Sequence, residues 1–182
     1  MRSRRTACAL PLLVSLTLLG AATPPAVRSL PEHTLLRRDE GVWNATIQIV
    51  PAPGASPEVS HGTETNVLGP GGLWLISDFK GQVMGEPFQG HGVLGYDPVK
   101  KKYVRIWVDS TQAFLWPSEG TYDPSTRTLT LWMESPDSSG QTVRFKTTTV
   151  WKDDNTRVYT MYAPASEAPE SASMTITYKR RK

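Results

Sequence analysis

The sequence predicts an all-β protein, an antiparallel up-and-down barrel of about ten strands preceded by a short N-terminal helix. From Gly41 onward, apolar and polar residues alternate with a period of two, as in Trp43, Ala45 and Ile47, which indicates strands. Short turn segments rich in Gly, Pro, Asp and Asn separate these strands, so sequence neighbours should pair antiparallel. They lie at residues 51–57, 69–72, 97–98, 123–124, 136–140 and 153–155. A two-sheet sandwich is the alternative, but a closed barrel removes every exposed edge.

Glycines concentrate in residues 81–110, a region that otherwise has the composition of strands. A strand that bends sharply around a small barrel needs residues without a Cβ at its corners. Five glycines meet that need: Gly81, Gly85, Gly90, Gly92 and Gly95. A phosphate-binding loop is the rival interpretation, but no Gly-Lys-Ser/Thr ending and no helical pattern follow. We therefore interpret this stretch as a bend in the barrel.

One helical signal precedes the strands. Ser29 is placed to cap the N-terminus, Pro31 falls in the first turn, and Glu32 follows the serine by three residues, as in a capping box. The helix should end at about Glu40. Its leucines give it one apolar side, which is what a plug packed against the end of a barrel requires.

The first 22 residues have the pattern of a secretory signal peptide. Arginines at positions 2, 4 and 5 precede an apolar run over residues 10–19 and then small residues, with cleavage expected after Ala22. The run is too short to cross a bilayer, so no stable membrane span is expected after cleavage. Residues 23–182 should then form a single barrel domain, located in the periplasm or secreted.

Composition narrows the partners. The net charge of +3 loses three arginines and no acid with the leader, so the remaining chain is neutral and has no field to draw it onto nucleic acid. The single cysteine, Cys8, belongs to the leader as well, so the domain must be stabilised by packing rather than by disulfides. The sequence leaves the oligomeric state open.

A series of short motifs resembles the bacterial DUF1579 family. In chain order they are His33 followed by Gly41-Val42-Trp43, His61-Gly62-Thr63-Glu64-Thr65, Gly71-Gly72-Leu73-Trp74-Leu75, Met84-Gly85-Glu86-Pro87-Phe88, Gly95-Tyr96-Asp97-Pro98, Trp107-Val108-Asp109-Ser110, Glu119-Gly120-Thr121-Tyr122 and Tyr178-Lys179-Arg180. The resemblance covers nearly all of residues 23–182. It implies a lipocalin-like or fatty-acid-binding-protein-like barrel, and it brings no established activity.

The candidate ligand-binding residues lie mainly on one strand, residues 103–109. Alternation puts Tyr103, Arg105 and Trp107 on one face and the aliphatic residues Val104, Ile106 and Val108 on the other. If the first face is internal, Arg105 would meet a ligand carboxylate and the tryptophans would form apolar walls. The opposite arrangement, an aliphatic core with Arg105 in solvent, is the one that the residues alone favour. The candidates are Arg105, Trp107, Trp116, Tyr103 and His91.

Metal and catalytic patterns are weak. His33, His61 and His91 are dispersed, without the spacing of a zinc site, and no metal site is predicted. No cofactor is expected, with haem on His91 kept as an alternative. No Gly-x-Ser-x-Gly elbow occurs, and no catalytic residue is predicted.

The function predicted from these observations is an exported binding module for a small, largely apolar molecule. Two alternatives stay open: a filled barrel that acts through its surface in envelope or protein interactions, and a hydrolase-type enzyme.

Overall fold

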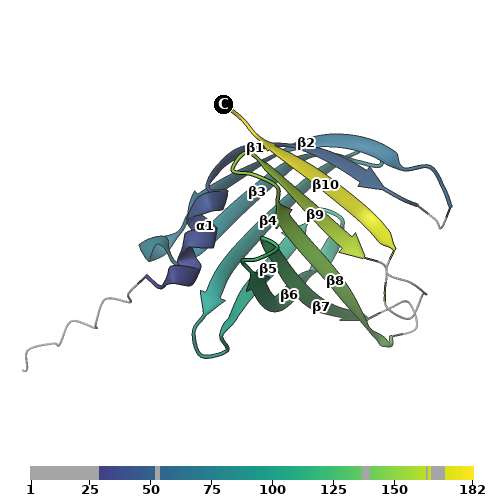
Figure 1. The fold of residues 1–182 in the computed structure, drawn as a ribbon. Coiled ribbons are helices and arrows are strands. Elements are labelled where there is room, and N and C mark those ends of the chain that lie inside the picture. Colours follow the sequence, from purple (N-terminus) through teal and green to yellow (C-terminus); the bar gives the residue numbers. More distant parts are fainter. Residues whose placement is uncertain (1–28, 52–53, 137–139, 163, 165–170) are drawn as a thin grey trace, which may run out of the picture.

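The computed structural model describes residues 29–51, 54–136, 140–162, 164 and 171–182. Within these ranges ten antiparallel strands close into a barrel with a short helix at one end, which confirms the predicted fold class (Figure 1). The predicted leader lies outside the described residues. None of the helices in the described part of the chain has the length and apolar character of a membrane span.

The strands follow one another around the barrel in chain order. Their bounds are β1 Gly41–Ile49, β2 Glu58–Leu68, β3 Trp74–Val83, β4 Glu86–Asp97, β5 Lys102–Asp109, β6 Gln112–Asp123, β7 Thr128–Pro136, β8 Thr142–Trp151, β9 Thr156–Tyr162 and β10 Ala172–Arg180. β1 closes the barrel by pairing with both β2 and β10, so that Trp43 lies opposite Glu64 on one side and Arg180 on the other. Every edge is therefore paired.

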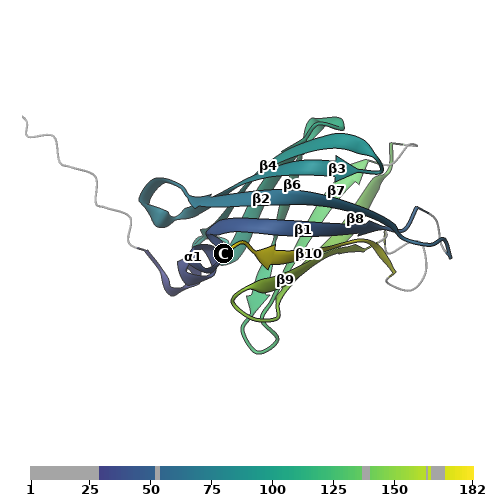
Figure 2. The ribbon, with the colours of Figure 1, turned by 90° about the horizontal axis from the view of Figure 1, so that it is seen from above.

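The two ends of the barrel differ. A 3-10 helix, η1 (Pro31–His33), continues into α1 (Thr34–Asp39) at the end where β10 finishes, which we call the helix end. The turn η2 (Pro70–Gly72) joins β2 to β3 at the same end. The connections β1–β2, β3–β4, β5–β6, β7–β8 and β9–β10 lie at the opposite end, called the far end below (Figure 2).

The helix begins differently from the expectation. Leu30, not Ser29, is the N-cap residue, and its backbone N–H donates to His33 Nδ1 at 2.8 Å. The Ser29 hydroxyl instead accepts a hydrogen bond from Arg37 at 2.9 Å. The predicted Ser29–Glu32 capping box was therefore wrong, because an imidazole nitrogen one residue beyond Glu32 satisfies the first free N–H of the helix.

The helix closes its end of the barrel as a plug. Leu35 and Leu36 enter the barrel interior and pack against a cluster of buried residues: Leu75, Tyr103, Leu129, Leu131 and Trp151. The Tyr103 hydroxyl also donates to the backbone carbonyl of Glu32 at 2.9 Å, which fixes the plug to β5. The interior under the plug is thus packed with the protein's own side chains, and an open surface pocket of about 440 Å³ lies beside it, between the helix and β4–β6.

The structure settles which face of β5 is internal. Tyr103 is buried, and Arg105 and Trp107 point into the barrel, whereas Ile106 is 48 % exposed on the outside. The sequence interpretation that favoured an aliphatic core was wrong. The outer wall carries a row of apolar residues in direct register across five strands: Val67, Ile76, Val93, Ile106 and Pro117. Both faces of β5 are therefore partly apolar, and hydrophobicity alone does not distinguish them.

The plug yields a test of stability. Leu36 is fully buried, so Leu36→Ala should lower the free energy of unfolding by about 2–5 kcal/mol through lost burial and the void that it leaves. Urea denaturation followed by circular dichroism measures this change. As a control, Val59→Ala on the exposed outer wall should change stability by about 0.5 kcal/mol or less. Equal effects of the two substitutions would contradict a plug seated in the barrel.

Candidate functional site

The far-end half of the barrel is hollow. A cavity of about 310 Å³ lies between the strands there. Its walls are mostly apolar and include Phe79, Phe88, Met133, Phe145, Met161 and Met174. Residues with polar groups line it at seven positions, namely Arg105, Asp109, Thr111, Gln112, Ser118, Tyr159 and Tyr178. Its lining is that of a small-molecule pocket, with a few polar groups in apolar walls.

Two tryptophans form one wall. Trp107 and Trp116 lie directly opposite each other on β5 and β6. The indole of Trp107 lies across Gly90 and Gly92 of β4, where a Cβ would overlap its ring atoms. Its Nε1–H donates to Asp109 at 3.1 Å, which fixes the ring orientation. The glycines of β4 therefore provide room for an aromatic ring inside the barrel. From the sequence alone, these glycines are explained only by a bend of the strand.

Arg105 lies beside this wall. Its guanidinium carbon is 4.8 Å from the centre of the Trp107 ring and 5.9 Å from that of Tyr159. It also donates a hydrogen bond to the Tyr159 hydroxyl. Among the described residues Arg105 takes part in none of the ion pairs.

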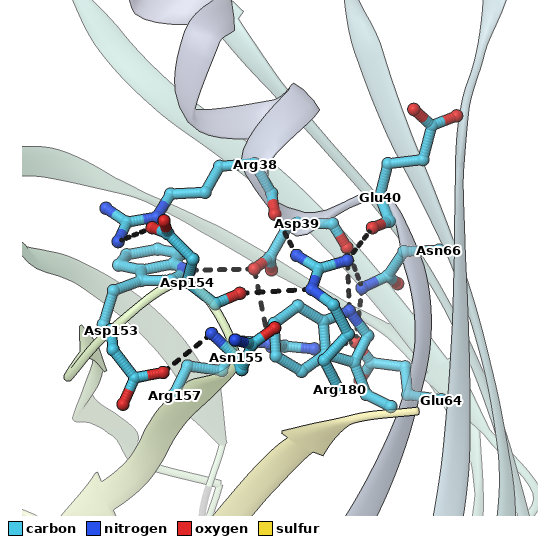
Figure 3. Close-up of polar contacts among 12 residues, drawn as sticks. Arg38, Asp39, Glu40, Glu64, Asn66, Asp153, Asp154, Asn155, Arg157 and Arg180 are labelled. Atoms are coloured by element: carbon cyan, nitrogen blue, oxygen red, sulfur yellow. Dashed lines mark hydrogen bonds and ion pairs between the residues drawn. The ribbon is translucent and has the colours of Figure 1, made fainter. Parts of the chain in front are cut away.

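Between the cavity and the plug lies a buried charge cluster, which we define as Asp39, Glu64, Asn66 and Arg157 (Figure 3). Arg157 pairs with Glu64 through Nη2 at 2.5 Å and with Asp39 through Nε at 3.3 Å. Asn66 donates to both the Glu64 carboxylate and the Asp39 backbone carbonyl, at 2.9 and 3.0 Å. The cluster thereby joins α1 to β2 and β9.

Aromatic side chains enclose the cluster. The Arg157 guanidinium carbon lies 3.9 Å from the ring centre of Tyr178 and 4.8 Å from that of Trp43. The Trp151 indole donates to the Asp39 carboxylate at 2.8 Å, and the Trp43 indole donates to the Asp39 carbonyl at 2.9 Å. These contacts compensate much of the cost of burying charge.

The pKa values of the two buried acids, Asp39 and Glu64, are shifted in opposite directions. Burial opposes ionisation of both, but the charge of Arg157 and the hydrogen bonds from Arg157 and Asn66 outweigh it at Glu64, so the pKa of Glu64 is lowered. At Asp39, burial raises the pKa by more than the charge of Arg157 lowers it, so the pKa of Asp39 is raised. Burial also raises the pKa of Tyr178 well above its usual range, and the Glu64 charge acts in the same direction.

Tyr178 connects the cluster to the cavity. Its hydroxyl hydrogen-bonds to Glu64, and its ring lines the cavity. At the helix end, the neighbouring Arg180 donates to the backbone carbonyls of Arg38, Glu40 and Asp154. The free carbonyls of Arg38 and Glu40 at the end of α1 are thus satisfied by β10, and that of Asp39 is satisfied by Trp43 and Asn66.

Of the five predicted ligand-binding residues, the structure brings three together. Arg105, Trp107 and Trp116 line the cavity. Tyr103 packs under the plug, outside this cavity, and lines the more open pocket beside the helix. His91 points outward and contacts Asp78 at 2.8 Å on the exposed wall. The outward direction of His91 follows from strand alternation, because its neighbours Gly90 and Gly92 face inward.

Sequence reasoning missed the buried charge cluster. One signal was present: Glu64 and Asn66 share the face of β2 that should be internal, and an internal acid requires a partner. The partner could not be named, because Arg157 is 93 residues further along the chain. Within the described ranges, no three His, Cys, Asp or Glu residues are grouped closely enough to hold a metal ion.

The cluster makes a pH-dependent contribution that can be measured. Glu64→Gln leaves Arg157 with one carboxylate and should reduce the free energy of unfolding at pH 7 by about 3–5 kcal/mol. Because the folded-state pKa of Glu64 is lowered, its stabilisation is present above its usual pKa of 4.5 and is lost as the pH falls through the folded-state value. The difference between wild type and variant should therefore narrow below about pH 4.5 in urea titrations.

The control for this measurement is Glu58→Gln, at an exposed position on the same strand, which should have little effect at any pH. A difference between wild type and Glu64→Gln that widens on acidification would contradict the assignment.

Comparison with protein families gives a match. A family model described as "Protein of unknown function (DUF1579)" matches residues 28–180, which include every strand of the barrel. A search of curated proteins finds no match. The match spans most of the chain, and it agrees with the resemblance of the sequence motifs. The chain therefore belongs to the DUF1579 family of proteins of unknown function.

Proposed function

We propose that the barrel binds a small, largely apolar molecule in its interior. The observation that carries this proposal is the cavity of about 310 Å³ at the far end, with its aromatic and methionine walls. Its volume falls at the lower end of the range of about 300–1,000 Å³ typical of ligand pockets. Methionine side chains adapt their shape to different apolar surfaces, which suits a wall that must close around a ligand.

The contrast between the two halves of the barrel supports this function. The interior under the plug is packed with large side chains, and the space beside the helix is a more open surface pocket, so the protein is able to fill its own interior where no space is needed. The far-end cavity is partly open, with the exposed residues Thr111 and Gln112 in its lining, so a small molecule is able to reach it from solvent. A ligand that occupies the space is the simplest reason for keeping it.

The hydrolase alternative has less support. The Asp78–His91 contact is the kind of acid–imidazole pair that a catalytic site uses, but it lies on the outer wall, with the Asp78 and His91 side chains 60 % and 48 % exposed. A catalytic pair needs a cleft that excludes water around the reacting atoms. Neither residue lines the cavity.

We propose in addition that residues 1–22 direct export of the chain. After expression in a secreting bacterial host, the mature protein should begin at Thr23, as read by intact mass and N-terminal sequencing. Leu16→Arg interrupts the apolar run of the leader and should leave the precursor uncleaved. Retention of Met1 in the wild-type protein would contradict this proposal.

Ligand binding is tested with a neutral, water-insoluble naphthylamine dye whose fluorescence rises in apolar surroundings. The wild-type protein should bind it with saturation at one dye per chain. Met161→Trp places a larger side chain in the cavity wall and should weaken binding at least about ten-fold, since an overfilled pocket excludes the dye.

The matched control is Val59→Trp, which adds a tryptophan to the exposed outer wall and should leave binding unchanged. Absence of saturable binding to the wild type would refute the proposed function. Equal binding by the wild type and by a folded Met161→Trp would place the dye elsewhere.

A further inference from the structure

Arg105 brings a permanent positive charge into an otherwise largely apolar cavity. A guanidinium stays protonated in proteins, so this charge cannot be removed by a change of protonation. Its contacts are the Tyr159 hydroxyl and the faces of two aromatic rings, and among the described residues it has no ion-pair partner. A charge that is partly removed from water without a counter-charge is unfavourable.

The nearest buried acid does not fill this role. Glu64 already accepts hydrogen bonds from Arg157, Asn66 and Tyr178. Arg105 affects Glu64 only through space, where its charge contributes to the lowered pKa of Glu64. The planar guanidinium of Arg105 is therefore still able to bind a carboxylate or phosphate with two parallel hydrogen bonds.

A second polar group lies beside Arg105. Ser118 is directly opposite Arg105 in the β5–β6 ladder, and its side chain lines the same cavity. With the Tyr159 hydroxyl, these residues form a polar pole, which we define as Arg105, Ser118 and Tyr159. They come from β5, β6 and β9, so the pole is built from rigid strands rather than from loops.

The residues around the pole change from polar to apolar toward the far end. On each of the three strands, the next inward residue in that direction is apolar: Trp107 after Arg105, Trp116 before Ser118, and Met161 after Tyr159. The cavity is thus amphipathic, with a cationic floor and apolar walls above it, and Asp109, Thr111 and Gln112 form a polar rim at the far end.

A cationic ligand is less well matched. Asp109 is the acid that lines the cavity, and both of its carboxylate oxygens already accept hydrogen bonds, from the Trp107 indole and from Thr111. Asp109 also ends β5, at the far end rather than in the interior. An amine at Asp109 would compete with the donors that its carboxylate already accepts from, whereas an anion at Arg105 would find guanidinium N–H groups free to donate.

We propose that the ligand is an amphipathic organic anion whose acidic group binds the polar pole and whose apolar body extends toward the far end. This inference rests on the proposed binding in the cavity. The acidic group would accept two hydrogen bonds from the Arg105 guanidinium and further ones from the Ser118 and Tyr159 hydroxyls. The inference adds the charge of the ligand and its direction in the barrel.

The test compares ligands with one tail and different head groups. Octanoate, octyl phosphate, octanol and octylamine are titrated into the full-length mature protein by calorimetry and by displacement of the naphthylamine dye. Wild type should bind octanoate or octyl phosphate about 10- to 100-fold more tightly than octanol, the range expected for hydrogen bonds to charged groups. The two anions distinguish a carboxylate head from a phosphate head.

Substitutions in the polar pole then test whether its residues cause the preference for anions over octanol. Arg105→Gln should remove the preference for the anion while octanol binding changes little, and Arg105→Lys should retain part of it. Ser118→Ala and Tyr159→Phe should each reduce anion binding several-fold. The control is Arg144→Gln, an exposed arginine that stacks on Trp132 at 4.2 Å and does not line the cavity. Circular dichroism and thermal unfolding confirm that each variant is folded.

The outcomes separate this inference from the proposed function. Wild type that binds octanol or octylamine as tightly as the anions would overturn the anionic ligand but leave the cavity as a binding site. An anion preference that survives Arg105→Gln would also overturn it. If neither the dye nor any of the four ligands binds, the proposed function fails and this inference fails with it.

Discussion

The Arg157 guanidinium pairs with two buried carboxylates from the N-terminal part of the chain, Asp39 at the end of α1 and Glu64 in the middle of β2. Because it lies on β9, this one cation joins the plug, an early strand and a late strand in the region where β1 and β10 close the barrel. Removing one partner from such an arrangement leaves a buried charge uncompensated, so each member depends on the others. The seat of the helix, and with it the filled half of the barrel, depends on this pairing.

The pairing also shapes the cavity. Tyr178 stacks on Arg157, bonds to Glu64 and presents its ring to the hollow half, so the floor of the cavity is held by the same contacts that hold the plug. The walls closer to the far end are methionine and phenylalanine side chains, which have no such polar anchors. The barrel therefore combines a rigid polar floor with adaptable walls. This arrangement suits a site that recognises a fixed head group and tolerates variation in the rest of its ligand.

Much of the fold is readable from the sequence, because period-two alternation and turn residues are local signals that barrel closure does not change. The orientation of β5 is not readable in this way, since Ile106 and its neighbours continue an apolar row on the outside while Arg105 and Trp107 occupy the inside. The charge cluster needs the Arg157–Glu64 pairing across 93 residues, and the Trp151 indole that donates to it from outside is 112 residues from Asp39. No pattern in a single sequence specifies such contacts. Of the candidate residues, Arg105, Trp107 and Trp116 lie together at the cavity, whereas His91 faces outward and Tyr103 lies under the plug. A single sequence does not specify these positions, because they depend on which face of each strand is internal and on where the helix is seated.

The Trp107 ring that lies on Gly90 and Gly92 has a consequence for how such barrels can diverge. The volume of the interior on this side is shared between one side chain of β5 and two positions of β4, so these three sites are expected to vary together among family members. A chain that gains a side chain at position 90 or 92 would need a smaller residue at position 107. Pocket shape could therefore change in evolution by exchanging bulk between adjacent strands, without any change in strand number or register.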